Sequence, residues 1–337
     1  MRGKGINYDT GFSPGGRNSR EHFDAGVVRA EMRVIARELR CTAARISGGD
    51  PGRLSTAGEL AAAEGLEVWF APFPCELTTD QLAPLLADCA DRAEHLRRAG
   101  ANVVLVTGCE LTLFAAGFLP GGTVYERIQG LQSGGQQLYA AYAALPGKLN
   151  GFLAATAEAA RGRFGGPLTY ASGMWEPVDW GPFDIAATDA YRDAGNAAAF
   201  RSELRKQMQH GKPLAVTEFG CCAYAGAGDR GGMGWAILDD SAGSPRLDGD
   251  YVRDESEQVR YLEELHGIFA AEGVDLAFWF TFAGYGLVHD PDPRRDLDLA
   301  SYGVVRMVPG GPGTGYQGLG WEPKLGFAAL AAAGHAI

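Results

Sequence analysis

The chain has 337 residues, of which 30 are basic and 41 acidic, giving a formal net charge of −11 at pH 7. This acidic balance, without any run of Lys or Arg, argues against nucleic acid and anionic membrane surfaces as partners. Hydrophobic residues make up 46% of the chain and charged residues 21%, which indicates a globular protein with a large apolar core.

The sequence also lacks the patterns of export and of metal binding. No apolar stretch approaches the roughly 20 residues that cross a bilayer, and the N-terminus does not resemble a signal peptide. We therefore expect a cytoplasmic protein, unless a leader has been removed. The six cysteines and six histidines form neither a CxxC motif nor a paired ligand spacing, so we expect no metal and no cofactor. The adjacent Cys221 and Cys222 are expected to be reduced thiols.

Eight short apolar segments follow one another along the chain and are typical of buried strands. They are Lys4–Asn7, Cys41–Ile46, Glu67–Pro72, Asn102–Thr107, Leu168–Ala171, Asp184–Ala187, Leu214–Thr217 and Asp275–Phe280. Amphipathic patterns predict helices between them, around residues 28–39, 85–98 and 259–269. A Gly- and Pro-rich loop from Pro309 to Gly320 should precede a short closing helix from Phe327.

Strands that alternate with helices imply a parallel sheet, because parallel neighbours need a crossover connection. Eight such units over this length predict the α/β class and a closed (β/α)8 TIM barrel, formed by residues 1–337 as a single domain. A doubly wound dinucleotide-binding sheet is disfavoured because no GxGxxG motif follows the first strand. One unit is short, since between Ala171 and Asp184 there is room only for a loop or one helical turn.

Two of the predicted strands deliver a glutamate at their carboxyl ends, Glu110 and Glu218. A carboxylate is unfavourable in a buried strand unless it is paired or used. The pair lies 218 − 110 = 108 residues apart, or 36 per unit if three βα units separate them, which assigns them to strands 4 and 7. Two carboxylates at one edge of a barrel suit acid/base and nucleophilic chemistry on a glycosidic bond. The structural alternative is that each carboxylate caps the next helix.

Four short motifs resemble the large clan of retaining glycoside hydrolases whose barrels carry an acid/base Glu on strand 4 and a nucleophile Glu on strand 7. Thr217-Glu-Phe-Gly220 resembles the clan's nucleophile strand, and Phe278-Trp-Phe280 resembles its strand-8 segment. Residues 298–304 (DLASYGV) and 321–327 (WEPKLGF) resemble its closing elements. The resemblance extends over nearly the whole chain and implies the same barrel.

The resemblance also implies roles for individual residues. Glu110 would be the acid/base and Glu218 the nucleophile. Arg45 at the end of strand 2 and Tyr191 after strand 6 would support the nucleophile, and Trp279 would form the floor of the sugar subsite. In a retaining glycosidase the two carboxyls are about 5–5.5 Å apart and work by double displacement. The expected substrate is a small glycoside or an oligosaccharide.

One position departs from the clan's pattern. Cys109 stands before Glu110 where the clan typically has an Asn that contacts the sugar 2-hydroxyl, and a thiol is a poor hydrogen-bonding group. Two alternatives therefore stay open. The first is a barrel that binds saccharide without cleaving it. The second is a lyase, isomerase or transglycosylase that acts on an unusual, secondary-metabolite glycoside.

The predicted loops at the carboxyl ends of the strands hold further candidates. Aromatic side chains there suit stacking on sugar faces or packing: Trp175, Trp180, Tyr224, Trp235 and Tyr285. Glu176, in the aromatic loop from Ser172 to Pro182, is a rival carboxylate that we expect to contact substrate or to lie at the surface. Four aspartates and glutamates near strand ends are candidates for binding hydroxyls: Asp50, Glu76, Asp179 and Asp189.

Overall fold

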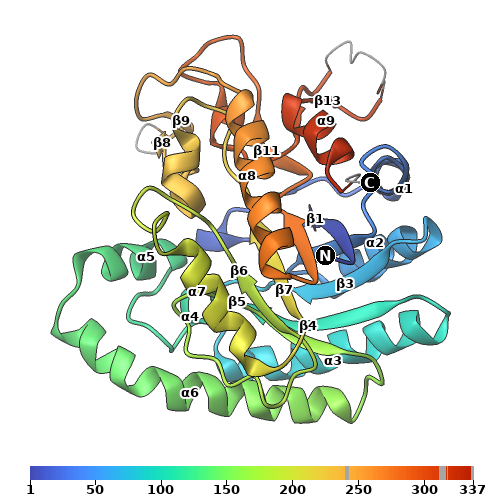
Figure 1. Cartoon of the computed structure of the whole chain (residues 1–337), viewed down its shortest axis with the longest axis vertical. Coiled ribbons are helices and arrows are strands. Elements are labelled where there is room, and N and C mark those ends of the chain that lie inside the picture. Colours follow the sequence, from blue (N-terminus) through green and yellow to red (C-terminus); the bar gives the residue numbers. More distant parts are fainter. Residues whose placement is uncertain (240–242, 311–315, 317, 335–337) are drawn as a thin grey trace.

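The computed structural model describes residues 1–239, 243–310, 316 and 318–334. Eight parallel strands form a closed barrel in the order β1-β10-β7-β6-β5-β4-β3-β2 (Figure 1). They are β1 (Gly3–Asp9), β2 (Ala43–Gly48), β3 (Glu67–Pro72), β4 (Val103–Cys109), β5 (Leu168–Gly173), β6 (Ala186–Asp189), β7 (Leu214–Phe219) and β10 (Leu276–Trp279). Each strand overlaps one of the eight predicted segments, so the (β/α)8 prediction is confirmed.

Helices surround the barrel (Figure 1). They are α1 (Ala25–Arg37), α2 (Pro51–Ala63), α3 (Thr79–Arg98), α6 (Gln136–Arg161), α7 (Phe200–Gln207), α8 (Ser256–Glu272) and α9 (Leu325–Ala332). Helix α3 begins at Thr79, earlier than the predicted residue 85, because Thr78 and Gln81 form a reciprocal capping box there. Residues 174–185, between β5 and β6, form a loop without a helix, as the short spacing predicted.

The side chains of the strands alternate between the inside of the barrel and the layer under the helices. Trp69, Val104 and Phe278 belong to the interior cluster, whereas their chain neighbours Val68 and Val103 pack in the outer core. This alternation decides which residue of each strand faces the site.

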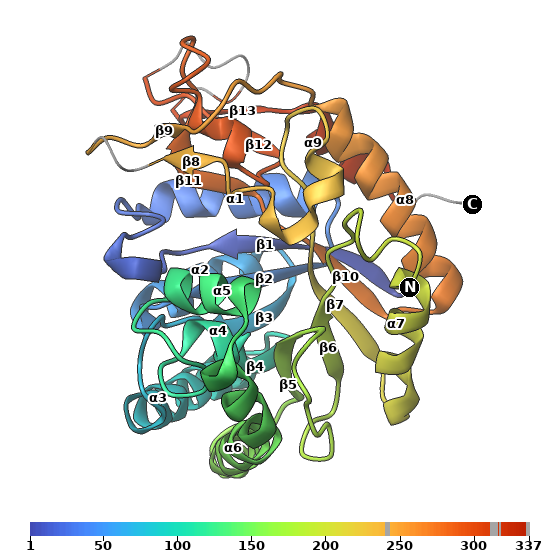
Figure 2. The same ribbon diagram turned by 90° about the vertical axis from the view of Figure 1, so that its left-hand side faces the viewer.

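Additional elements gather at the carboxyl ends of the strands, where Figure 2 shows α4 and α5 in front of the barrel. Helices α4 (Leu111–Phe114) and α5 (Val124–Ser133) follow β4; the 3₁₀ helix η3 (Ala227–Met233) and the hairpin β8 (Leu238–Asp239) and β9 (Arg246–Leu247) follow β7; and the small sheet of β11 (Ala283–Val288), β12 (Val305–Met307) and β13 (Trp321–Pro323) follows β10. The predicted loop from Pro309 to Gly320 lies partly outside the described residues.

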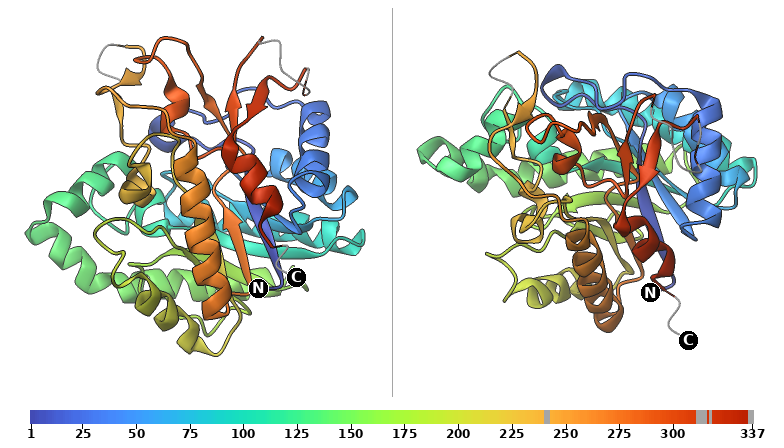
Figure 3. Two further views of the ribbon diagram at one scale, coloured as in Figure 1. Left: turned by 45° about the horizontal axis from the view of Figure 1, so that its top comes forward. Right: turned by 90° about the horizontal axis from the view of Figure 1, so that it is seen from above.

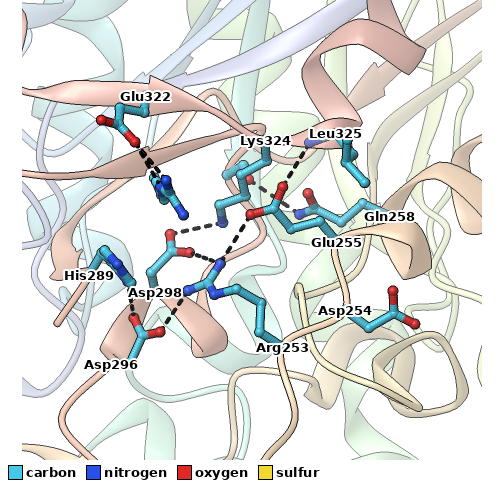
Figure 4. A network of polar contacts seen from close by, with 12 residues as sticks. Arg253, Asp254, Glu255, Gln258, His289, Asp296, Asp298, Glu322, Lys324 and Leu325 are labelled. Atoms are coloured by element: carbon cyan, nitrogen blue, oxygen red, sulfur yellow. Dashed lines mark hydrogen bonds and ion pairs between the residues drawn. The ribbon is translucent and has the colours of Figure 1, made fainter. Parts of the chain in front are cut away.

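Ion pairs join the last part of the chain to the segment that precedes α8. Helices α8 and α9 lie side by side (Figure 3). Figure 4 shows Arg253 paired with Asp296 at 2.8 Å and with Asp298 at 2.9 Å, while Lys324 pairs with the other oxygen of Asp298 at 2.8 Å. Asp298 and Lys324 are both buried, so water screens this ion pair little.

A second buried carboxylate joins the beginning and the end of the chain. Glu31 of α1 is fully buried and accepts a hydrogen bond from the hydroxyl of Tyr8. Its carboxylate also binds Arg20 at 3.2 Å, the Tyr285 hydroxyl at 2.9 Å and the Trp321 indole N–H at 3.0 Å. Tyr285 is thereby engaged in a structural network, which favours packing over the sugar stacking considered from the sequence.

Two general features complete the description. All six cysteines are free thiols, Cys221 and Cys222 included. Among the described residues, no helix combines the length and the apolar character that crossing a membrane requires.

Candidate active site

Glu218 lies within β7, and both of its carboxylate oxygens accept hydrogen bonds. Arg45 of β2 donates to its Oε1 at 2.6 Å, and the Tyr191 hydroxyl donates to its Oε2 at 2.9 Å. Arg45 is almost fully buried, and its guanidinium also donates to Asn7 Oδ1 at 2.7 Å. Asn7 and Arg45 are register partners on β1 and β2, so the sheet itself aims the guanidinium at Glu218. The structure therefore brings together the three residues predicted to form the nucleophile's site.

Glu110 directly follows β4 in a left-handed backbone conformation, with φ 39° and ψ 49°. A non-glycine residue reaches this region only at a cost, which the surrounding structure has to offset. The backbone N–H of Glu110 donates to Ala171 O at 2.9 Å, which ties the turn to β5. The side chain does not cap helix α4, so the structural alternative of a capping carboxylate is wrong for Glu110.

The electrostatic surroundings of Glu110 oppose its ionisation. Burial is the largest cause that raises its pKa well above the ordinary value, followed by the negative charges of Asp189, Glu218 and Glu176. The positive charge of Arg45 acts in the opposite direction. A raised pKa favours the protonated form of the carboxyl, which is the form that a general acid requires.

Glu176 does not lie at the surface of its loop, contrary to the prediction. It is buried, and its carboxylate accepts hydrogen bonds from Thr112 N at 3.0 Å, Gly173 N at 3.1 Å and the Tyr170 hydroxyl at 2.8 Å. The Tyr170 hydroxyl in turn accepts from Leu111 N at 2.7 Å. Burial raises the pKa of Glu176 to about 7. Since Leu111 and Thr112 follow Glu110 directly, this pair supports the turn that carries Glu110 and is not free to contact substrate.

The thiol of Cys109 lies against two carboxylates, whereas the Asn typical of the clan at this position contacts a sugar hydroxyl. It is 3% exposed, and its Sγ lies 3.5 Å from Asp189 Oδ2 and 3.7 Å from Glu218 Oε1. Burial and the neighbouring charge of Asp189 raise the pKa of the thiol well above its ordinary value, so the thiol keeps its proton and donates. Asp189 is also buried, and its burial together with the negative charge of Glu218 raises its pKa well above the ordinary value.

The same three side chains have the composition of a possible metal site. Their ligand atoms, from Cys109, Asp189 and Glu218, lie within 4.8 Å of one another. However, Arg45 already binds Glu218 Oε1, and its positive charge opposes a cation. This group is therefore a hydrogen-bonded cluster around the nucleophile.

Trp279 does not floor a sugar subsite, and this prediction is wrong. Its side chain has no exposed surface, packs edge-on against Phe219 at 5.4 Å between ring centroids and donates from Nε1 to Tyr302 O at 3.1 Å. Because Phe278 points into the barrel, Trp279 must point outward into the core under the helices. The next residue, Phe280, is half-buried, packs on Tyr302 and lies against the same apolar cluster as Tyr191.

The other predicted aromatic residues separate into core and rim. Tyr224 and Trp180 are buried, at 2% and 3% exposed, so neither offers a ring face to a sugar. Trp175 is 41% exposed and donates to Thr112 Oγ1 at 3.2 Å, and Trp235 is partly exposed. The sequence could not show that Tyr224 is buried, because a position in a loop does not determine the exposure of a side chain.

Three of the four candidate hydroxyl-binding carboxylates accept hydrogen bonds from backbone N–H groups. Asp50 caps α2 through Gly52 N and Arg53 N, and Asp179 accepts from Gly181 N. Glu76 accepts from Gly15 N and Val124 N, at 3.0 and 3.1 Å. These contacts join loops of the rim. Only the fourth, Asp189, lies beside the two glutamates.

Sequence reasoning missed three residues that shape the site. Asn7 was detectable as a polar residue within an apolar strand, and Phe280, directly after β10, was detectable by continuing the alternation of that strand by one residue. Tyr170 carried no signal, because an inward or outward tyrosine on a buried strand is ordinary.

The fold is shared with glycoside hydrolases of known structure. A GH113 beta-1,4-mannanase matches with a TM-score of 0.63 and 12% identity, covering 99% of this chain and 99% of its own. The GH113 beta-mannanase AaManA from Alicyclobacillus acidocaldarius, in complex with ManMIm, matches with a TM-score of 0.58 and 17% identity, covering 97% of this chain and 95% of its own. A beta-glucuronidase from Parabacteroides merdae matches with a TM-score of 0.53 and 13% identity, covering 97% of this chain and 36% of its own.

No family model matches the sequence, and no curated protein matches it. At these identities the similarity to the solved structures shows the fold. It confirms, at that level, the resemblance to the clan of barrel glycoside hydrolases that the sequence motifs suggested.

Proposed function

We propose that this protein is a retaining glycoside hydrolase that acts on a small glycoside or oligosaccharide. The observation that carries the proposal is the contrast between two glutamates at the carboxyl ends of β4 and β7. Glu218 is bound by a guanidinium and a phenol, whereas Glu110 is half-buried beside carboxyl groups whose negative charges raise its pKa. One carboxylate and one carboxylic acid are the pair that double displacement requires.

In the first step, Glu218 attacks the anomeric carbon and forms a glycosyl ester, while Glu110 gives its proton to the departing oxygen. The ester carries no negative charge, so one cause of the raised pKa of Glu110 disappears at this stage. Glu110 is then a carboxylate that accepts a proton from water. The water attacks the anomeric carbon, the ester bond breaks, and Glu218 regains its charge with the original configuration restored.

Two neighbours support these steps. Tyr191 and Arg45 hold the attacking carboxylate in one orientation, which favours a near-attack geometry. The protonated thiol of Cys109 adds a weak donor to the same carboxylate. The similar solved structures include beta-mannanases, so β-mannosides and β-1,4-manno-oligosaccharides are the first substrates to test.

The test is Glu218→Gln with 4-nitrophenyl β-mannoside and a panel of other 4-nitrophenyl glycosides. We expect turnover to be lost while the circular dichroism spectrum and thermal unfolding stay unchanged. Glu203→Gln, at an exposed carboxylate of α7, is the matched control and should retain full activity. Activity of Glu218→Gln within about tenfold of wild type refutes the nucleophile assignment.

Glu110→Ala provides an independent test of the acid. We expect a large loss with poor leaving groups, a smaller loss with 4-nitrophenolate, and rescue by azide through a glycosyl azide of retained configuration. Equal losses on both kinds of substrate, without rescue, indicate a structural role for Glu110. Saccharide binding without turnover in the wild-type protein supports the alternative of a binding barrel instead.

A further inference from the structure

Two aromatic side chains meet from the loops that follow the two glutamate-bearing strands. Tyr125 lies in the first turn of α5, after β4, and Trp235 lies after η3, beyond β7. Their ring centroids are 5.9 Å apart, with an interplanar angle of 57°. Because β5 and β6 separate β4 from β7 in the barrel, this contact joins loops that are not neighbours around the rim.

The surroundings of Tyr125 show which side of the mouth the pair covers. Glu76, after β3, accepts hydrogen bonds from Gly15 N in the β1 loop and from Val124 N at the start of α5. A Cβ at Gly15 would lie 2.7 Å from the Tyr125 ring, so the ring lies directly on this glycine, whose φ is 62°. Figure 2 shows the β1 loop between α5 and the β8–β9 hairpin. Tyr125 therefore lies above the β1 side of the barrel mouth.

Trp235 belongs to the layer next to the nucleophile. It packs on the same apolar cluster as Tyr191 and Phe280. Gly232, three residues earlier, lies against Tyr191, where a Cβ would be 3.3 Å from the ring. Since Tyr191 binds Glu218, Trp235 packs on the same apolar cluster as a residue that contacts the nucleophile.

The space beneath this side of the mouth is also occupied. Phe12 of the β1 loop, Phe73 after β3 and Phe114 of α4 form a row, with ring centroids 4.9 and 4.6 Å apart. They cap the interior cluster of the barrel. Aromatic side chains thus fill the β1 to β4 side below and bridge it above.

The β5 side is different. The loop after β5 has no helix, and its Trp175 is the most exposed tryptophan among those considered, at 41%. The indole of Trp175 donates to Thr112 Oγ1, two residues beyond Glu110. An acid has to face the leaving-group oxygen, so this open side, next to Glu110, is where the leaving group extends.

We propose that the Tyr125–Trp235 pair closes the glycon side of the site, so that the protein removes units from the non-reducing end of a saccharide and does not cut internal bonds. The leaving-group part of the chain lies over Trp175, whose ring face suits sugar C–H surfaces. This specificity rests on the proposed glycosidase function.

The test compares β-1,4-mannohexaose with the same hexaose blocked at its non-reducing end by a 4,6-O-benzylidene group, with cellohexaose as a parallel probe. In the wild type we expect kcat/KM for the blocked hexaose to be lower by more than about 100-fold. In the double variant Tyr125→Ala/Trp235→Ala we expect this difference to shrink to less than about tenfold, with internal cleavage products seen by mass spectrometry. Tyr139→Ala removes an aromatic ring that is 71% exposed on α6 and serves as the matched control, with no change expected.

Efficient cleavage of the blocked hexaose by the wild type overturns the proposal that the pair closes the site. An unchanged ratio of kcat/KM for the free and blocked hexaoses in the double variant also overturns it. The folded state of the double variant is verified by thermal unfolding, and the single variants Tyr125→Ala and Trp235→Ala replace it if it fails to fold. If the wild type turns over no glycoside, the proposed function fails separately. The closure is then decided by calorimetric binding of the blocked and free hexaoses, since only an open site binds both equally.

Discussion

Replacing Trp279 should affect stability and leave substrate recognition nearly intact. The indole is fully buried and packs on Phe219, so its truncation to Ala should cost about 3–5 kcal/mol of the free energy of unfolding. The lost hydrogen bond contributes little, because Tyr302 O also accepts from Gln258 Nε2 at 3.3 Å and Thr281 N at 3.4 Å. Trp279→Phe, which keeps a ring in the cavity, should therefore cost only about 1–2 kcal/mol.

Phe280→Ala should do the reverse. This ring is half-buried against the same apolar cluster as Tyr191, so we expect a loss of about 1 kcal/mol in stability but about a tenfold fall in kcat/KM. Urea denaturation followed by circular dichroism measures the stability of both variants, and initial rates on 4-nitrophenyl β-mannoside measure their recognition. A Trp279→Phe protein of unchanged stability and strongly raised KM would refute the assignment of inward and outward residues on β10.

Three further predictions concern the acid, the thiol and a buried ion pair. Glu176→Gln removes a charge that raises the pKa of Glu110, so the alkaline limb of the kcat/KM profile should move to lower pH; an unmoved limb contradicts this coupling. Wild type should prefer a 2-hydroxy glycoside to its 2-deoxy analogue by less than about tenfold, and Cys109→Asn should increase that preference; a large preference in both proteins shows that another residue contacts the hydroxyl. Lys324→Met leaves Asp298 without one of its two cations and should lower the free energy of unfolding in urea by about 3 kcal/mol, whereas an unchanged midpoint excludes a stabilising role for the pair.

The barrel was predictable because its signals are local. Each of the eight strands is a short apolar run between turn residues, and the crossover rule turns their alternation with helices into a parallel barrel. The short strands β8, β9, β12 and β13 were not predictable. Each has two or three residues, too few to show a pattern, and forms only because another segment supplies its partner, as when Arg306 pairs with Glu322 across β12 and β13.

In the site, too, the residues marked by local signals were predictable and those that depend on distant contacts were not. Glu110 directly follows β4 and Glu218 lies near the end of β7, where topology alone brings side chains together, whereas Arg45 lies in the middle of β2 and not at its end as predicted. The burial of Glu176 depends on its meeting Tyr170 and backbone groups after β4, which no local pattern reports. The outward direction of Trp279 could have been read from strand alternation, and the resemblance to a motif overrode that simpler rule.

The position of Glu31 has a consequence for the order in which the molecule can assemble during synthesis. Two of the groups that bind its carboxylate, on Tyr285 and Trp321, leave the ribosome some 250 residues or more after Glu31 itself. Until then, docking α1 onto the barrel would bury a charge with half of its donors missing, which costs several kcal/mol. Strand β1 likewise has to wait for β10 to complete its pairing. A nascent chain should therefore keep α1 undocked and accessible to chaperones until Trp321 has emerged, so that assembly of the barrel is a late event and not a stepwise growth from its first strand.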